Sequence, residues 1–156
     1  VQNRIQTMAL VHENLYKSSS FDYIELSSYI KTLVNHLQSI NKAEDKNIEV
    51  HFDIQARLEL PIEQVISIGL IVNEAISNAY KYAFKGRSSG KIDLHIEERN
   101  EHIHIEIQDD GPGFNDVDVK ESSLGIKLIH IMSAQLNANY AMIKDHGILH
   151  KIDFKI

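Results

Sequence analysis

The sequence has no cysteine, which excludes disulfide bridges, thiolate zinc sites and cysteine nucleophiles. It also has no long hydrophobic run. The most apolar stretch, residues 65–72, includes Ser67 and Gly69, whereas a membrane-spanning helix needs about 20 apolar residues. A G-x-x-x-x-G-K-[ST] phosphate loop is missing as well, so a nucleotide would require another kind of site. We find no internal repeat, no low-complexity segment and no signal peptide.

Basic residues are outnumbered by acidic ones. The 156 residues include 16 Lys and Arg against 22 Asp and Glu, a formal net charge of -6. Because phosphate backbones attract basic surfaces, nucleic acid is not expected as a partner. Hydrophobic residues make up 43% of the chain, enough for one folded domain with a short extension. The chain opens with Val1 rather than Met. We therefore expect a cytoplasmic fragment without membrane contact, from a parent protein that is free or membrane-anchored.

Hydrophobic periodicity predicts helices in four places. At the start of the chain, Ile5, Met8 and Leu15 fall on one face of an amphipathic helix, whose partner must come from elsewhere. A polar break at residues 18–20 follows and predicts a domain boundary. The other three helices are predicted over about residues 27–41, 61–84 and 123–136.

Alternation of apolar and polar residues predicts the strands. They cover about residues 21–26, 48–54, 91–97, 102–108, 139–144 and 148–155. Strands that are covered on both faces are continuously apolar, whereas these alternate, so one face of the sheet should be exposed. The predicted fold is α/β (α+β): a two-layer sandwich in which a mixed sheet has helices on one face only.

The most apolar predicted helix includes three polar residues at positions i, i+4 and i+7: Glu74, Asn78 and Lys81. This spacing places them on one helical face. The amide oxygen can ligate Mg²⁺, the ammonium can meet phosphate charge, and the carboxylate can accept a proton. A solvated helix stripe would show the same spacing. However, the apolar flanks predict a largely buried helix, and buried polar groups need partners.

A second polar segment, residues 109–114 (DDGPGF), directly follows a predicted strand. Asp109 can accept a hydrogen bond from an exocyclic amine such as that of adenine. Gly111 and Gly113 would allow a planar ring to approach the backbone. The alternative is a tight turn, since Asp, Gly and Pro are common turn residues.

A third segment, residues 122–127 (SSLGIK), lies at a predicted helix start. Backbone N–H groups at that position bind phosphate readily, and Ser122 or Ser123 can cap the helix as well. The two interpretations are compatible with each other.

In this order and at this spacing, the three segments resemble the N, G1 and G2 boxes of sensor histidine kinases. The resemblance covers about residues 20–156. The superfamily, called GHKL, also includes gyrase-type topoisomerases, mismatch-repair ATPases and heat-shock chaperones. Residues 1–19 resemble part of the dimerisation and phosphotransfer helix of the HisKA_2-type subfamily, which favours the histidine kinases. We therefore predict two domains: this partial helix, and an ATP-binding catalytic domain (HATPase_c) over residues 20–156.

The resemblance implies a Bergerat-type ATPase fold that binds ATP and Mg²⁺. It implies that Glu74 is the catalytic base or orienting residue, that Asn78 ligates Mg²⁺, and that Asp109 recognises adenine. Residues 115–123 would form the ATP lid. The ATP-binding residues implied in this way are Asn78, Lys81, Tyr82, Asp109, Gly111, Gly113, Ser123, Leu124 and Gly125.

In such kinases the γ-phosphoryl group of ATP passes to a histidine, and a response regulator then receives it. The resemblance implies a homodimeric parent whose acceptor histidine precedes residue 1, so His12 is interpreted as structural. The sequence departs from the family pattern in having one glycine, Gly125, in the G2 box. It also has Ile148 after Gly147, where Thr is common, and Asp110, where Asn is common.

Other interpretations stay open at this point. The same residues suit an ATPase or a protein-serine kinase of this superfamily, because Glu74 could equally activate water or a hydroxyl group. A non-catalytic nucleotide-binding module, or a structural sandwich with a solvated helix face, would also fit. His102 and His104 share a predicted strand face, where a metal is conceivable but a solvated face is the more common arrangement.

Overall fold

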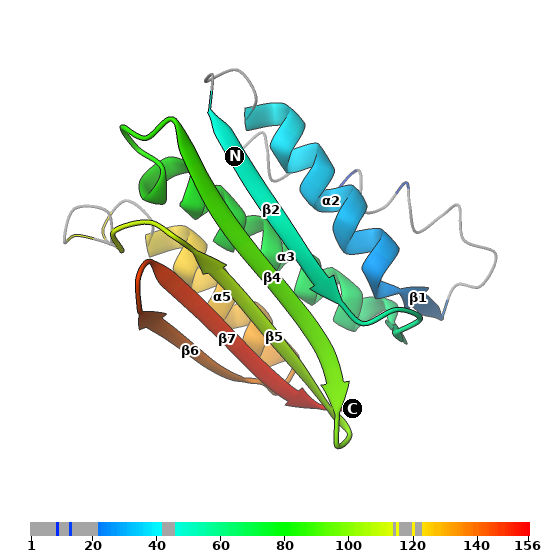
Figure 1. The fold of residues 1–156 in the computed structure, drawn as a ribbon. Coiled ribbons are helices and arrows are strands. Elements are labelled where there is room, and N and C mark those ends of the chain that lie inside the picture. Colours follow the sequence, from blue (N-terminus) through cyan, green and yellow to red (C-terminus); the bar gives the residue numbers. More distant parts are fainter. Residues whose placement is uncertain are drawn as a thin grey trace.

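The computed structural model describes residues 9, 13, 22–41, 46–113, 115, 120 and 123–156. In this part of the chain, helices lie against one side of a sheet (Figure 1). Of the helix predicted around residues 5–15, residues 9 and 13 are described and both are helical; its other residues lie outside the described ones. The elements are β1 (Tyr23–Glu25), α2 (Leu26–Asn41), β2 (Asn47–Ile54), β3 (Glu59–Pro61), α3 (Ile62–Asn78), η2 (Ala79–Ala83), β4 (Ser89–Arg99), β5 (His102–Asp109), α5 (Ser123–Gln135), β6 (Asn139–Lys144) and β7 (Ile148–Lys155).

The main sheet has five strands in the order β2-β4-β5-β7-β6. β2 pairs in parallel with β4, and the other neighbours are antiparallel, so the predicted mixed sheet is confirmed. A parallel pair needs a long crossover connection, and here the crossover contains α3. The register pairs Ile92 with Asp109 and Gln108 with Leu149. The end of β5 therefore lies beside the starts of β4 and β7.

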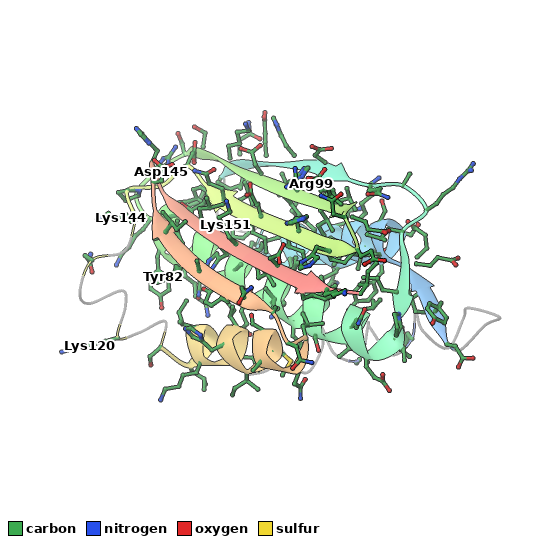
Figure 2. All side chains as sticks on the ribbon, turned by 90° about the horizontal axis from the view of Figure 1, so that it is seen from below. Tyr82, Arg99, Lys120, Lys144, Asp145 and Lys151 are labelled. Carbon is green, nitrogen blue, oxygen red and sulfur yellow. The ribbon has the colours of Figure 1, made fainter. Side chains whose placement is uncertain are left out.

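The two faces of the sheet differ in polarity. Side chains of β5 alternate between half-buried and buried along the whole strand, as expected of a sheet with one covered face. Figure 2 shows the helices below the sheet, and Arg99 and Lys151 on the sheet itself. The predicted two-layer sandwich with helices on one face is therefore confirmed. Within the described ranges, no helix is both long and apolar enough to cross a membrane.

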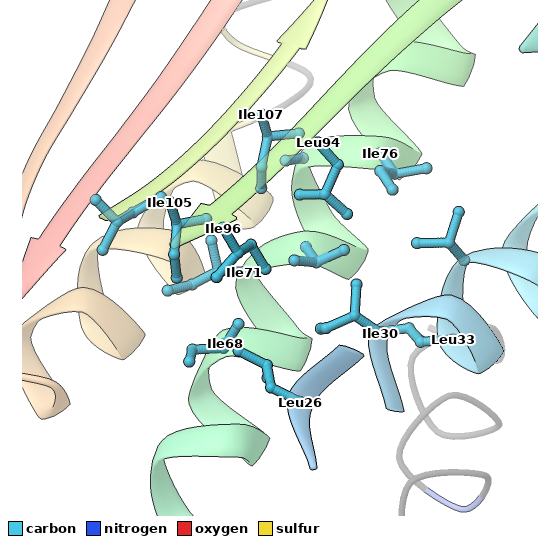
Figure 3. Close-up of a cluster of buried hydrophobic side chains, with 14 of the residues drawn as sticks. Leu26, Ile30, Leu33, Ile68, Ile71, Ile76, Leu94, Ile96, Ile105 and Ile107 are labelled. Carbon is cyan, nitrogen blue, oxygen red and sulfur yellow. The ribbon is translucent and has the colours of Figure 1, made fainter. Parts of the chain in front are cut away.

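The hydrophobic core lies between the sheet and the helices, and α3 runs through its middle (Figure 3). Fully burying one aliphatic side chain contributes roughly 1.5–3 kcal/mol, so this layer fixes the position of α3 firmly. The cluster drawn in Figure 3 includes Leu26, Ile30, Leu33, Ile68, Ile71, Ile76, Leu94, Ile96, Ile105 and Ile107.

Two features differ from the prediction. Pro61 was expected in the first helical turn, but it ends β3, which pairs with β1 through Ile24 and Leu60. The strand predicted over about residues 21–26 is present as β1. Its partner β3 has three residues, too few to show alternation, so the sequence pattern did not reveal it. The central helix was expected to continue to Phe84. Instead α3 ends at Asn78, and Ala79–Ala83 form a wider π turn.

Candidate functional site

Glu74 and Asn78 are almost fully buried on α3, with 2% and 5% of their surfaces exposed. They face the first turn of α5. A methyl group at Gly125 would lie 2.7 Å from Glu74 Oε2 and 3.5 Å from Asn78 Nδ2. No larger residue fits at Gly125 unless these side chains move. The structure thus brings the first and third predicted segments together.

The polar groups of this pair are held differently. The Asn73 amide Nδ2 donates a hydrogen bond to Glu74 Oε1 at 3.2 Å, which orients the carboxylate. Asn78 Nδ2 is buried without a hydrogen-bond partner among the described residues. Leaving a buried donor unpaired costs about 1–3 kcal/mol. This amide is therefore available to a ligand that enters beside α3.

Lys81 does not share the burial of the pair. It lies on the π turn and is exposed, whereas Tyr82 beside it is half-buried. The wider turn changes the angular spacing of side chains after Asn78, because its hydrogen bonds run from i to i+5. The predicted single row of Glu74, Asn78 and Lys81 therefore holds for its first two members only. Lys81 can still reach a ligand from the surface.

Asp109 ends β5 and is 8% exposed. Its Oδ1 accepts hydrogen bonds from the backbone N–H groups of Gly111, at 2.9 Å, and Ile148, at 3.3 Å. Among the described residues, no donor to Oδ2 is present. Burial raises the pKa of Asp109 above its usual value, against the lowering effect of these two hydrogen bonds. The carboxylate thus has one oxygen fixed by the backbone and one left to accept a donor.

Glycines make the surroundings of Asp109 close-fitting. A methyl group at Gly111 would lie 2.6 Å from the Ala83 side chain, so the second predicted segment packs on the π turn that follows Asn78. A methyl group at Gly147 would lie 2.0 Å from the Asp109 carbonyl oxygen. The three predicted segments therefore converge on one helix: Gly125 meets α3, and Gly111 meets η2 directly after it.

Gly113, with φ +80°, lies under the side chain of Lys144 at the end of β6. Figure 2 places Lys144 toward the same end of the molecule as Tyr82 and Asp145. At the start of α5, Ser123 and Leu124 are exposed, with helix N–H groups beside them. Of the predicted lid, residues 115, 120 and 123 are described, and Ser122 lies outside the described residues.

The open face of the sheet carries a separate hollow of about 490 Å³. Its charged residues pair with one another: Lys151 lies 3.0 Å from Glu106, and Arg99 lies 3.5 Å from Glu97. This hollow is on the sheet face away from α3, so it is not the place where the three segments meet. His102 and His104 both contact the Asp153 carboxylate there. In the described ranges, no group of three or more His, Asp or Glu side chains is placed to hold a metal ion.

Sequence reasoning missed four residues around the site: Asn73, Arg87, Lys144 and Gly147. Asn73 has a signal, because it directly precedes Glu74 in the apolar helix. Gly147 lies between two predicted strands and has a φ of +121°, as in a turn, but its contact with Asp109 depends on strand register. Arg87 and Lys144 come from a loop and a strand end. Nothing in their local pattern distinguishes them from other exposed cations.

Comparison with known proteins agrees with this geometry. The model of the histidine kinase-like ATPase domain matches residues 48–141, which is more than half of the chain. A histidine kinase model, HisKA_2, matches residues 1–41. The chain belongs to the histidine kinase-like ATPase domain family. The predicted class, a catalytic domain of the histidine-kinase type whose family binds ATP, is thereby confirmed.

Individual relatives point the same way. Blue-light-activated histidine kinase 2 of Erythrobacter litoralis is 24% identical over an aligned length of 145 residues, and the match covers 88% of this chain and 41% of that protein. The chain therefore spans less than half of that relative. The serine-protein kinase RsbW of Listeria innocua is 28% identical over 72 residues, which are 46% of this chain and 45% of that protein.

Solved structures show the same fold at low sequence identity. The histidine kinase domain of the Erythrobacter litoralis EL346 blue-light activated histidine kinase superposes with a TM-score of 0.82 at 21% identity. The superposition covers 99% of this chain and 73% of the other chain. The catalytic domain of histidine kinase ThkA has a TM-score of 0.67 at 16% identity, with 85% and 94% covered.

Proposed function

We propose that this chain binds ATP with Mg²⁺ and transfers the γ-phosphoryl group to a histidine outside these 156 residues. One observation carries the proposal: both glycine segments, far apart in sequence, pack on the single helix that carries Glu74 and Asn78. Gly125 approaches these two side chains, and Gly111 approaches Ala83 one turn further along. The family match to an ATPase domain supports the same ligand.

At the base end, Asp109 accepts a hydrogen bond from the exocyclic amine of adenine. Oδ2 is suited to this, because Oδ1 already accepts two backbone N–H groups. The absence of a side chain at Gly111 and Gly113 leaves the backbone accessible to a planar ring. Tyr82 and Lys81 contact the nucleotide from the π turn.

At the phosphate end, the residues present fit a bound cation. Asn78 is buried with an unpaired amide nitrogen, and its amide oxygen is the kind of ligand that Mg²⁺ accepts. When bound, Mg²⁺ would neutralise phosphate charge during transfer. The N–H groups at the start of α5, by Ser123, Leu124 and Gly125, bind phosphate oxygens.

Glu74 orients the attacking group or accepts its proton. Asn73 holds one carboxylate oxygen at 3.2 Å, so the side chain does not swing freely. Phosphoryl transfer depends mostly on positioning and charge stabilisation, which suits a site with few catalytic side chains. Glu74 is buried beside Gly125, so its side chain is packed between α3 and α5.

The wider arrangement is part of the proposal. Residues 1–19 belong to a dimerisation helix and residues 20–156 form the catalytic domain, in a homodimeric cytoplasmic parent that passes the phosphoryl group to a response regulator. His12 is structural in this scheme. An N-terminally extended chain with His12→Gln should still form phosphohistidine, and loss of the label would identify His12 as the acceptor instead.

Titration of ATP, with and without Mg²⁺, tests the site. Asp109→Asn should weaken binding strongly, because the amide loses the charge and can present a donor to the base amine. The exposed Asp93→Asn on β4 is the matched control. Asn78→Ala should weaken binding more with Mg²⁺ than without it, against Asn139→Ala as its control. Unchanged affinity in Asp109→Asn would remove the base site, and equal losses in Asn78→Ala would remove the metal role.

The similarity to RsbW favours one alternative, a protein-serine kinase that uses the same site. The linkage formed by the extended protein separates the two functions. Phosphohistidine is labile in acid and survives alkali, whereas phosphoserine shows the opposite behaviour. ATP binding without any turnover would instead identify a non-catalytic module, and release of free phosphate alone would identify an ATPase.

A further inference from the structure

The loop between η2 and β4 is folded tightly over the ring of Phe84. Phe84 is fully buried, and the Arg87 N–H donates to its carbonyl oxygen at 3.1 Å. A methyl group at Gly90, near the start of β4, would lie 2.3 Å from the ring. The chain therefore passes directly across the Phe84 ring as it enters β4. The guanidinium carbon of Arg87 lies 5.8 Å from the ring centre. These contacts fix the direction in which the Arg87 side chain leaves the loop.

The Arg87 side chain reaches the turn that follows Asp109, where it holds Asp110. Nη1 donates to the Asp110 carbonyl oxygen at 2.8 Å and to Oδ1 at 3.2 Å, and Nη2 donates to Oδ2 at 3.2 Å. The Lys91 N–H donates to Oδ1 at 3.0 Å, and the Asp110 N–H donates back to the Lys91 carbonyl at 3.1 Å. Both the backbone and the side chain of Asp110 are therefore fixed to β4 and the loop.

We propose that Arg87 is a positioning residue for nucleotide binding, which holds Asp110 so that the adjacent Asp109 carboxylate stays in place. The inference rests on the proposed function, in which Asp109 meets the base. Among the described residues, the Asp109 carboxylate is bonded only through Oδ1, to the N–H groups of Gly111 and Ile148. Gly111 belongs to the turn itself, so the direction of Oδ2 depends on what holds the turn.

The charges around the turn agree with this role. Burial raises the pKa of Asp109, the charge of Asp110 raises it further, and Arg87 lowers it. For Asp110, burial is outweighed by hydrogen bonds from Lys91 N–H and Arg87, which hold its pKa below the usual value. Without Arg87, an uncompensated Asp110 would oppose ionisation of Asp109. A protonated Asp109 accepts the base amine less well than the carboxylate does.

ATP titration of the whole chain tests this role with four variants: Arg87→Ala, Arg87→Lys, the double variant Arg87→Ala with Asp110→Asn, and Arg99→Ala. Arg99, which lies 3.5 Å from Glu97 at the other end of β4, is the matched control. Arg87→Ala should weaken ATP binding about threefold to tenfold, since the lost ion pair is partly exposed. In this variant, the loss of ATP binding on acidification should also begin at a higher pH. Lysine should restore part of the affinity, and so should the double variant, which removes the repelling charge.

An Arg87→Ala variant that binds ATP as tightly as Arg99→Ala would overturn the inference. So would a loss that neither Arg87→Lys nor the double variant reduces, because that pattern reflects general damage to the loop. Asp109→Asn, measured alongside, separates the two levels. If Asp109→Asn binds like the unchanged chain, the proposed base site is wrong. If it loses binding and Arg87→Ala does not, only the role of Arg87 is wrong.

Discussion

Replacing Gly147 with alanine should disturb the position of Asp109, at the base end of the proposed site, more than any other glycine-to-alanine change. The added carbon would lie 2.0 Å from the Asp109 carbonyl oxygen and 2.7 Å from its Oδ1, distances that real contacts essentially never show. The backbone φ of +121° is also one that residues with a side chain rarely adopt. The turn between β6 and β7 must therefore move away from Asp109.

The magnitude follows from two losses. Backbone strain at such a position costs about 1–3 kcal/mol. Moving the turn also breaks the 3.3 Å hydrogen bond from the Ile148 N–H to Asp109, and a buried group left unpaired costs about 1–3 kcal/mol. We expect Gly147→Ala to lower the free energy of unfolding by about 2–6 kcal/mol, the sum of these two losses. ATP binding should weaken at least about tenfold, since a tenfold change equals only about 1.4 kcal/mol.

Gly86→Ala is the matched control. Gly86 also has a positive φ, +73°, but a methyl group there meets nothing within 4 Å. It tests backbone strain without the contact to Asp109. Urea unfolding and ATP titration of both variants, at equal concentration, measure the difference. If Gly147→Ala loses no more stability and no more ATP affinity than Gly86→Ala, the packing of β7 against Asp109 does not shape the site, and the argument fails.

Two further predictions follow from buried contacts. Gly125→Ala should weaken ATP binding because its methyl group would displace Glu74 Oε2. An ATP titration that gives the same affinity for the variant and the unchanged chain would contradict this. Burial lowers the pKa of His150 to about 4, against about 6.5 when unfolded. The unfolded chain thus binds the extra proton first, and stability should fall by up to about 3 kcal/mol as the pH drops from 6.5 to 4. Urea unfolding of His150→Phe should lack this component; an identical pH slope would refute it.

Periodicity alone predicted most of the fold, for a physical reason. The strands have one wet face, so their sequences alternate, and α3 is buried, so it is almost continuously apolar. The strand near Tyr23–Glu25 was predicted, but its pairing with β3 was not, because the three residues Glu59–Pro61 are too few to define a period. The π turn was equally hidden, since Ala79–Ala83 consists of residues that an α-helix would accept.

The candidate site was predictable in composition but not in shape. Glu74 and Asn78 stand out as polar residues in an apolar helix, and burial of polar groups requires partners. Asp109 stands out because it opens a glycine-rich segment directly after a strand. The contact between Gly147 and Asp109 depends instead on how β7 aligns with β5, where Gln108 pairs with Leu149. These two strands are separated in sequence by α5 and β6, so no local pattern reveals which of their residues pair.

In the proposed function, the π turn allows one helical segment to contribute to both ends of a nucleotide. In a continuous α-helix, Asn78 and the residues after it would keep a constant angular spacing of 3.6 residues per turn. The wider turn at Ala79–Ala83 resets that spacing. As a result Asn78 faces Gly125 of α5, while the small side chain of Ala83 faces Gly111 beyond β5. Because both contacts are fixed to the same buried helix, the separation between the base end and the phosphate end is set by the backbone of α3 and η2. In the proposed function, this backbone holds Asn78 and the turn beside Asp109 at a fixed separation along one extended ligand.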